Sequence, residues 1–250
     1  MEPIVTALNA QHAELEGHLL GLDEENWHRP TRCEGWDVAD VVLHLAQTDE
    51  YAVSSLRDEF EVSIASSSGQ TAVGNVDDAA GVMVEQERGG PAAELFERWQ
   101  RAASDLRHEL EDADPRRRVT WVTGKLSVQT LATTRLSEAW IHSDDVAEAL
   151  GKPLVPSDRL QFIARLAWRT VPYAFIRDGR EPPGPVAFEL RGPNGEEWNF
   201  VPDEAPVTTI RGEAAELCAV AAQRVDPAST NLRGDGPDAD AVLELVRTYA

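Results

Sequence analysis

The fold is decided by residues 35–45, which read GWDVADVVLHL. Asp37 is a good N-cap residue, and Asp40 lies three positions later, where its carboxylate can reach back to free backbone amides. Trp36 precedes the cap, in the position of a hydrophobic staple. Apolar residues then recur at helical spacing as far as about residue 56. The stretch therefore predicts an amphipathic helix that begins immediately after Asp37.

Three further helical stretches accompany this one. Apolar residues recur at helical spacing over residues 3–22, over residues 77–112 with an interruption at Gly89-Gly90-Pro91, and over residues 127–150. A stretch rich in serine and glycine, Ser63 to Asn75, predicts a mobile loop where a ligand could enter. Four helices within residues 1–153 predict an all-α four-helix bundle.

The pattern changes after Pro156. A helix is predicted from Asp158 to about Val171, and a proline-rich break follows at residues 181–185. Alternating residues then predict strands over 186–190 and 197–201, joined by the turn Gly192-Pro193-Asn194-Gly195. A third strand over 207–210 and helices over 213–224 and 238–249 complete the pattern. Residues 154–250 therefore predict a second, α+β domain.

The charge of the chain excludes several classes of protein. Its 250 residues carry 44 acidic and 23 basic side chains, a formal net charge of −21. Such a surface repels phosphate backbones, and the one basic run, residues 116–118, is too short to offset it, so nucleic acid is not an expected partner. Only two of the basic residues are lysines, which fits either a GC-rich coding sequence or a salt-rich cytoplasm.

Neither a membrane nor a disulfide is expected. No apolar run approaches the roughly 18 residues of a membrane span, and the N-terminus lacks the basic start of a signal peptide. The expected location is therefore the cytoplasm. Cys33 and Cys218 are far apart in the chain, and two lone cysteines are typical of free thiols in a reducing compartment.

Two predicted helices carry residues that could bind a metal. Glu138 and His142 are four positions apart, so both side chains project from one helix face and could hold one divalent ion. His44 lies between two leucines on the helix after Asp37, on or near its apolar face. The alternatives are a solvated Glu–His pair on the surface and a histidine satisfied in the core. Three potential ligands on two core-facing helices make a metal site the rival hypothesis.

Two of these stretches resemble a known family. Residues 35–45 resemble the second-helix motif of DinB-like metal-binding bundles and, more narrowly, of the mycothiol-dependent maleylpyruvate isomerase family. Arg135, Glu138, His142 and Asp145, followed by Ala149 and Gly151, are similar to that family's Arg-x-x-Glu-x-x-x-His-x-x-Asp-x-x-x-Ala-x-Gly signature. The resemblance continues through Asp158 to Phe175 and covers nearly the whole chain. That stretch looks like an uncharacterised branch of metal-binding proteins related to the isomerase.

The resemblance implies a DinB-like bundle, a sterol-carrier-like second domain and a divalent ion. The ion, usually zinc, would be held by His44, Glu138 and His142, and this mixed donor set also accepts Ni²⁺, Fe²⁺ or Mn²⁺. Such a set leaves a coordination position open for water or a thiolate, which is typical of catalytic zinc. In the isomerase the metal activates a low-molecular-weight thiol.

Several neighbouring residues could support this site. Asp145 could accept the free ring N–H of a ligand histidine, or it could pair with Arg135 on the helix surface. Arg135 could instead orient an anionic substrate, and both residues are candidates for catalytic roles. His12 could approach the metal, although a packed role is favoured. Cys33 has no activating group nearby in the sequence, so a nucleophilic role is not expected.

The favoured function is that of a metal-dependent and thiol-dependent transferase or isomerase acting on a small molecule. The alternatives are a metal-dependent hydrolase that uses activated water, and a non-catalytic protein that binds a metal or ligand. The expected partners are a small-molecule substrate or thiol, with the protein a monomer or a homodimer. The second domain departs from the true maleylpyruvate isomerases, so no substrate-binding role is assigned to its arginines.

Overall fold

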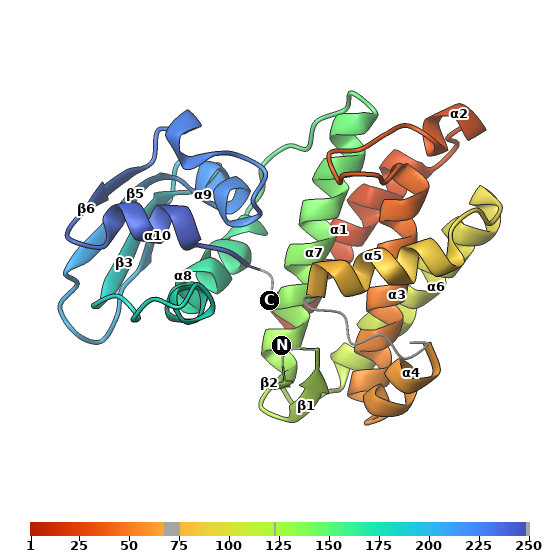
Figure 1. The fold of residues 1–250 in the computed structure, drawn as a ribbon, viewed down its shortest axis with the longest axis horizontal. Coiled ribbons are helices and arrows are strands. Elements are labelled where there is room, and N and C mark those ends of the chain that lie inside the picture. The colour runs from red at the N-terminus through yellow and green to blue at the C-terminus, as the bar shows by residue number, and fades with distance from the viewer. Residues whose placement is uncertain (68–75, 123, 249–250) are drawn as a thin grey trace. The chain divides into compact units, whose positions relative to one another are not determined.

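The computed structural model describes residues 1–67, 76–122 and 124–248 (Figure 1). The chain divides into two compact units, Met1–Leu154 and Val155–Ala250. The first unit is built of helices with one short hairpin, and the second combines helices with a small sheet. The prediction of a helical part followed by a mixed part is confirmed.

Long helices form the body of the first unit. They are α1 Glu2–Leu19, α3 Val38–Leu56, α6 Ala92–Glu111 and α7 Val128–Ala149. Helix α3 packs against α6 and α7, and α1 packs against the same two helices. Leu15 of α1, Val41 and Leu45 of α3 and Trp99 of α6 meet in one buried cluster. Burial of these apolar faces drives the assembly and fixes which faces of α3 and α7 point inward.

The start of α3 is fixed by its own sequence. Asp37 accepts a hydrogen bond from the backbone N–H of Asp40 over 2.9 Å, and the carboxylate of Asp40 accepts one from the backbone N–H of Asp37 over 3.2 Å. This capping box satisfies amides that have no partner within the helix. Trp36 packs against the buried cluster beside it. The predicted helix start is therefore confirmed, and it sets the rotational position of His44 two turns later.

Shorter elements connect the long helices: α2 Glu24–Trp27, α4 Phe60–Ser67, α5 Val76–Glu87, and the antiparallel strands β1 Arg118–Trp121 and β2 Gly124–Ser127. The predicted interruption at Gly89 is confirmed, because α5 ends before it and α6 begins after it. The predicted loop over residues 63–75 is wrong for residues 63–67, which belong to α4. Phe60 anchors that helix against Tyr51 and Trp121. Residues 68–75 lie outside the described residues.

The second unit is a mixed sheet with helices. Its elements are α8 Leu160–Arg177, β3 Val186–Arg191, β4 Glu197–Phe200, β5 Thr208–Glu213, α9 Ala214–Ala221, the 3₁₀ turn Pro227–Ser229, β6 Arg233–Asp235 and α10 Ala239–Leu245. The strand order is β4-β3-β5-β6, with β3 and β5 parallel and the other neighbours antiparallel. The predicted hairpin around residues 192–195 is confirmed, whereas β6 was not predicted.

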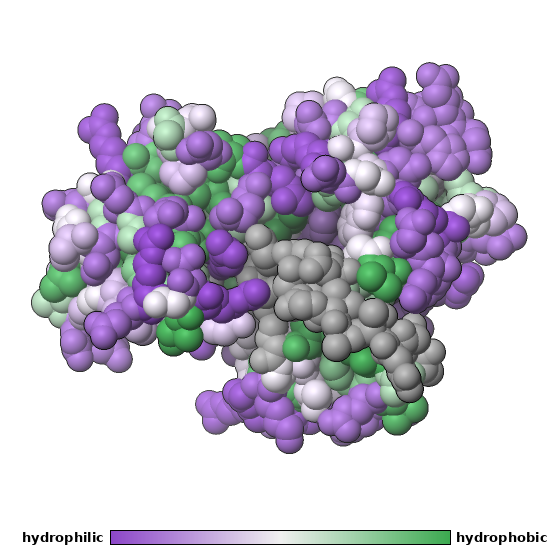
Figure 2. Space-filling view, in the orientation of Figure 1, coloured by the Kyte–Doolittle hydropathy of each residue, from purple (hydrophilic) through white to green (hydrophobic). Residues whose placement is uncertain are grey.

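The drawn face of the molecule is mainly hydrophilic (Figure 2). Figure 2 shows hydrophilic residues over most of the coloured surface on the drawn face, with hydrophobic residues in smaller patches. Among the described helices none combines the length and the apolar character that crossing a bilayer requires.

Candidate metal centre

The three predicted ligands lie together inside the first unit. His44 comes from α3, and Glu138 and His142 come from successive turns of α7. Glu138 Oε2 lies 3.5 Å from His44 Nε2 and 3.7 Å from His142 Nε2. One ligand atom of each residue lies within 4.8 Å of the others. Both histidines are buried, and the side chain of Glu138 is 20% exposed. The cluster therefore belongs to the interior, unlike a solvated surface pair.

Helix α7 presents its two residues because of how it begins. Ser127 caps the helix by accepting a hydrogen bond from the backbone N–H of Thr130 over 3.1 Å. Buried apolar residues along α7, among them Leu131 and Leu136, turn their sides of the helix toward the interior, and Leu131 lies on the same face as Glu138 and His142. The i, i+4 spacing then places Glu138 beneath His142 on the inward side.

An aromatic side chain covers one side of the cluster. The Trp36 ring centroid lies 5.2 Å from that of His44 and 6.5 Å from that of His142. The two imidazoles are nearly perpendicular, with centroids 4.8 Å apart. The indole therefore gives the cluster an apolar wall, and such a wall strengthens electrostatic interactions behind it.

The protonation states of the cluster follow from burial and from its internal contacts. Burial lowers the pKa of His44 to about 4, against the opposing effect of Glu138. Burial acts to raise the pKa of Glu138, but the hydrogen bond with His44 and the charges of His142 and Arg135 bring it down to about 2. Burial likewise acts to lower the pKa of His142, but contacts with Asp145, Cys33 and Glu138 raise it to about 9. At neutral pH, Glu138 and His44 thus already have the protonation states of metal ligands, whereas His142 holds a proton that it must lose before its Nε2 can bind an ion.

The geometry and donor types fit a divalent ion. Zinc–ligand bonds of about 2.0–2.1 Å place neighbouring donors of a tetrahedral site roughly 3.4 Å apart. The observed distances from Glu138 Oε2 to the two imidazole nitrogens, 3.5 and 3.7 Å, are close to this spacing. Two nitrogens and one carboxylate oxygen suit zinc and also nickel, iron or manganese. His44 Nδ1 has no hydrogen-bond partner among the residues that the structure describes.

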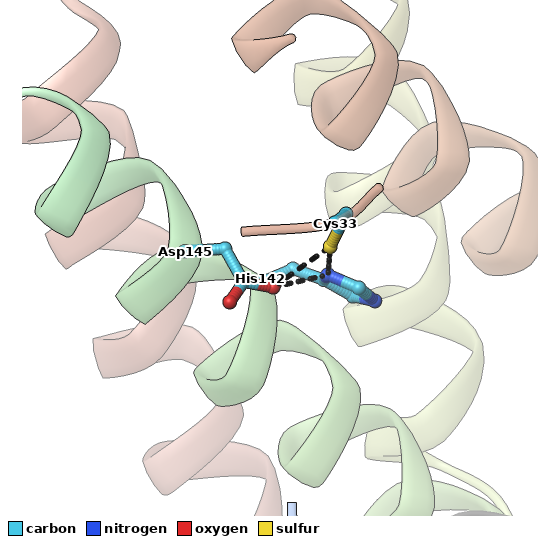
Figure 3. Close-up of side chains that lie close together, drawn as sticks. All are labelled: Cys33, His142 and Asp145. Carbon is cyan, nitrogen blue, oxygen red and sulfur yellow. Dashed lines mark hydrogen bonds and ion pairs between the residues drawn. The ribbon is translucent and has the colours of Figure 1, made fainter. Parts of the chain in front are cut away.

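A second cluster lies on the far side of the His142 ring. His142 Nδ1 is 3.0 Å from Asp145 Oδ2, and the Cys33 thiol donates to the same oxygen over 3.2 Å. Figure 3 shows His142 and Asp145 projecting from α7 and Cys33 approaching from the loop before α3. Arg32 Nε donates to Asp145 Oδ1 over 3.1 Å. Neither Arg32 nor the contact of Cys33 with Asp145 is predicted from the sequence, because residues some 110 positions apart in the chain give no local signal of contact.

Arg135 lies deeper in the same unit. It is 2% exposed, its Nε donates to Asp49 Oδ1 over 3.0 Å, and its Nη2 donates to Thr48 over 2.8 Å. The predicted alternative of an Asp145–Arg135 pair on the helix surface is wrong: Asp145 lies against His142 and Arg32, and Arg135 pairs with Asp49. The catalytic roles of Arg135 and Asp145 stay predictions.

His12 is packed into the core. Its Nδ1 accepts a hydrogen bond from Arg107 over 3.0 Å, its Nε2 lies 3.7 Å from Asp49 Oδ2, and its ring meets Trp99 edge-on at 6.0 Å. Burial and the charges of Arg107 and Arg135 lower its pKa to about 3. The favoured expectation of a packed histidine agrees with these contacts.

The fold and this cluster define a class: two-unit proteins with a buried two-histidine, one-glutamate centre on two helices of the first unit. The chain belongs to the family whose model is described as the mycothiol maleylpyruvate isomerase N-terminal domain, and the match covers residues 8–147. This confirms the resemblance seen in the sequence.

Similar proteins span both units. Two uncharacterized proteins of Mycobacterium tuberculosis, Rv0036c of strain H37Rv and MT0041 of strain CDC 1551, are each 33% identical over 250 residues, covering 99% of this chain and 95% of theirs. The crystal structures of the mycothiol-dependent maleylpyruvate isomerase and of a mutant of it share the fold, with a TM-score of 0.63 and coverage of 95% of each chain. Their sequence identity to this chain is 16% and 15%.

Proposed function

We propose that the protein is a metal-dependent enzyme that uses a low-molecular-weight thiol to transfer a group to, or isomerise, a small molecule. The observation that carries the proposal is the convergence of His44, Glu138 and His142 inside the first unit, with donor spacings that suit one divalent ion. Membership of the maleylpyruvate isomerase family supports the choice of a thiol as partner.

Each residue has a role in this proposal. His44 and His142 present Nε2, and Glu138 presents a carboxylate oxygen, as the three protein ligands. Three ligands leave a coordination position open. A bound divalent ion supplies Lewis acidity, which favours the thiolate form of a thiol or the hydroxide form of water near neutral pH. Trp36 shields one side of the centre.

The arrangement of the units is part of the same proposal. Helices α1, α3, α6 and α7 are proposed to form a DinB-like four-helix bundle over residues 1–153, since they pack against one another around one buried cluster. Residues 154–250 are proposed to be a sterol-carrier-like domain, on the strength of the structural likeness along the whole chain.

Metal content tests the first half of the proposal. Purified wild-type protein should hold about one equivalent of divalent metal, and His44→Ala and Glu138→Ala should hold little. His108→Ala is the matched control, because His108 lies on the surface with its side chain 82% exposed. Equal and low metal content in all four proteins would show that the centre is not a metal site.

Cobalt substitution tests the second half. Addition of mycothiol or another thiol to the cobalt-loaded protein should produce thiolate-to-cobalt charge-transfer bands. Isomerisation of maleylpyruvate in the presence of mycothiol is the first reaction to assay, because the structurally similar enzyme is named for it. A spectrum that responds to pH but to no thiol would favour the hydrolase, and a spectrum that responds to neither would favour the non-catalytic binding protein.

A further inference from the structure

The loop that precedes α3 is held in one conformation. The Thr31 backbone N–H donates to the Trp36 carbonyl over 3.0 Å, and the Trp36 N–H donates to the Cys33 carbonyl over 3.0 Å. The Thr31 hydroxyl accepts from the Cys33 N–H over 3.2 Å. Gly35 takes a left-handed conformation, with φ of 77°, which closes the turn at little steric cost. Arg32 and Cys33 are therefore presented to α7 by a rigid turn.

Both oxygens of Asp145 are engaged by this loop. Arg32 Nε lies 3.1 Å from Oδ1, and the Cys33 thiol donates to Oδ2 over 3.2 Å. The same Oδ2 lies 3.0 Å from His142 Nδ1. Asp145 is fully buried. A buried carboxylate needs cations and hydrogen-bond donors in place of water, and the loop supplies one of each.

We propose that Arg32 and Cys33 are positioning residues for the metal centre, acting on His142 through Asp145. The inference rests on the proposed function, because it concerns how a metal ligand is held. A fixed carboxylate at Nδ1 requires that nitrogen to be the N–H donor, so the lone pair of the neutral ring is at Nε2, facing Glu138. The loop thereby selects the tautomer and the ring orientation that a metal at Nε2 requires.

The same cluster could be viewed as a second metal site, since a thiol, an imidazole and a carboxylate are all metal ligands. Two observations disfavour that interpretation. The second site would use Nδ1 of the imidazole whose Nε2 already faces Glu138. Arg32 also lies on Asp145, where its positive charge opposes a cation.

Zinc affinity, measured by competition with a chromophoric chelator, tests the proposal. The full-length variants are Arg32→Ala, Arg32→Lys, Cys33→Ala and Cys33→Ser. Arg32 pairs with Asp144 as well as Asp145. Arg98→Ala is the matched control, because Arg98 likewise bridges two carboxylates, Glu50 and Glu87, and has a side chain 31% exposed, against 28% for Arg32. Arg32→Ala should bind zinc up to about 10-fold more weakly, the lower end of the about 10- to 100-fold expected for loss of a ligand's own partner, because Arg32 acts on Asp145 and not directly on His142. Arg32→Lys should recover part of this loss, and Arg98→Ala should match the wild type.

The cysteine variants give a second, milder test. Cys33→Ala should weaken zinc binding several-fold, whereas Cys33→Ser should stay within about threefold of wild type, because a hydroxyl can still donate to Asp145. If Arg32→Ala does not fold, the zinc affinities of Arg32→Lys and of the two cysteine variants test the proposal instead. Cobalt-loaded wild type should show no sulfur charge-transfer band before a thiol is added.

Three results would overturn the proposal. The first is zinc affinity within twofold of wild type in both Arg32→Ala and Cys33→Ala, with stoichiometric metal still bound. The second is an equal loss of affinity in Arg98→Ala, which would indicate a general structural effect. The third is a sulfur-to-cobalt band that disappears in Cys33→Ser, which would make Cys33 a ligand. A wild type that binds no zinc would instead overturn the proposed function itself, and this inference with it.

Discussion

The buried pair of Arg135 and Asp49 allows a quantitative test of how the interior of the first unit is held together. The two side chains are 2% and 1% exposed, and their charged groups are 3.0 Å apart. Thr48 accepts a second hydrogen bond from Arg135. The other oxygen of Asp49, Oδ2, has no hydrogen-bond partner within residues 1–67, 76–122 and 124–248. Asp49 therefore depends strongly on Arg135.

The structure sets the size of the expected effect. Arg135→Met removes the cation and leaves a buried carboxylate, which typically costs about 3–5 kcal/mol. Asp49→Leu leaves the buried guanidinium without its counterion and should cost a similar amount. The double variant replaces the pair by apolar groups, and such replacements are often neutral or stabilising by roughly 1–4 kcal/mol. The double variant should therefore be much more stable than either single variant.

Urea unfolding followed by far-ultraviolet circular dichroism measures this cycle. With a slope of about 1–3 kcal/mol per molar urea, each single substitution should lower the midpoint by roughly 1–5 M. Arg98 and Glu50 form the control pair, with side chains 31% and 43% exposed, and their coupling should stay below about 1 kcal/mol. Destabilisation of the double variant equal to the sum of the two single effects would refute the assignment of Arg135 to Asp49.

A buried histidine, the metal centre and the cap of α3 each give a further measurable expectation. The pKa of His12 is about 3 in the folded protein and about 6.5 in the unfolded chain. The stability due to neutral His12 is therefore complete above pH 6.5 and is lost as the pH falls toward 3. Lowering the pH from about 7.5 to 5.5 should reduce the free energy of unfolding of wild type by about 1.4 kcal/mol more than that of His12→Gln. Asp49, Arg107 and Arg135 surround residue 12 in both proteins, so their own effects cancel, and equal losses would contradict the expectation. Zinc at 100 times its dissociation constant should stabilise wild type by about 2.7 kcal/mol, and Glu138→Ala should lose this effect in thermal unfolding; an equal effect in the variant would place the metal elsewhere. Asp37→Ala should cost about 1 kcal/mol in urea unfolding, because the capping box is lost; an unchanged midpoint would show that the cap is dispensable.

The features that the sequence predicts well are those set by neighbouring residues. The cap at Asp37 depends on a residue three positions later, and the relation of Glu138 to His142 depends on one helical turn. The turn at residues 192–195 likewise follows from its own composition. In each case the geometry depends only on residues close together in the chain, so a single sequence is enough to predict it.

The features that it does not predict depend on contacts between distant segments. Helix α4 forms through serine-rich residues because Phe60 packs against Trp121, about 60 positions away. The contact of Cys33 with His142 requires the loop before α3 to lie against α7, which no spacing rule reveals. The partner of Arg135 is ambiguous for the same reason, because several acids lie near it in the sequence and tertiary packing selects Asp49.

The pairing of the buried acids gives an independent argument for a cation at the centre. The chain has 21 arginines and two lysines. Three buried acids each pair with an arginine: Asp40 with Arg88, Asp49 with Arg135 and Asp145 with Arg32. Planar guanidinium groups suit this task, because they bring several fixed donors to a desolvated carboxylate. Glu138 faces two histidines instead. Among the described residues, the other buried carboxylates pair with permanent cations, whereas one partner of Glu138, His142, is a cation only because its pKa is raised to about 9. A divalent ion that displaced this proton would complete the partner set of Glu138.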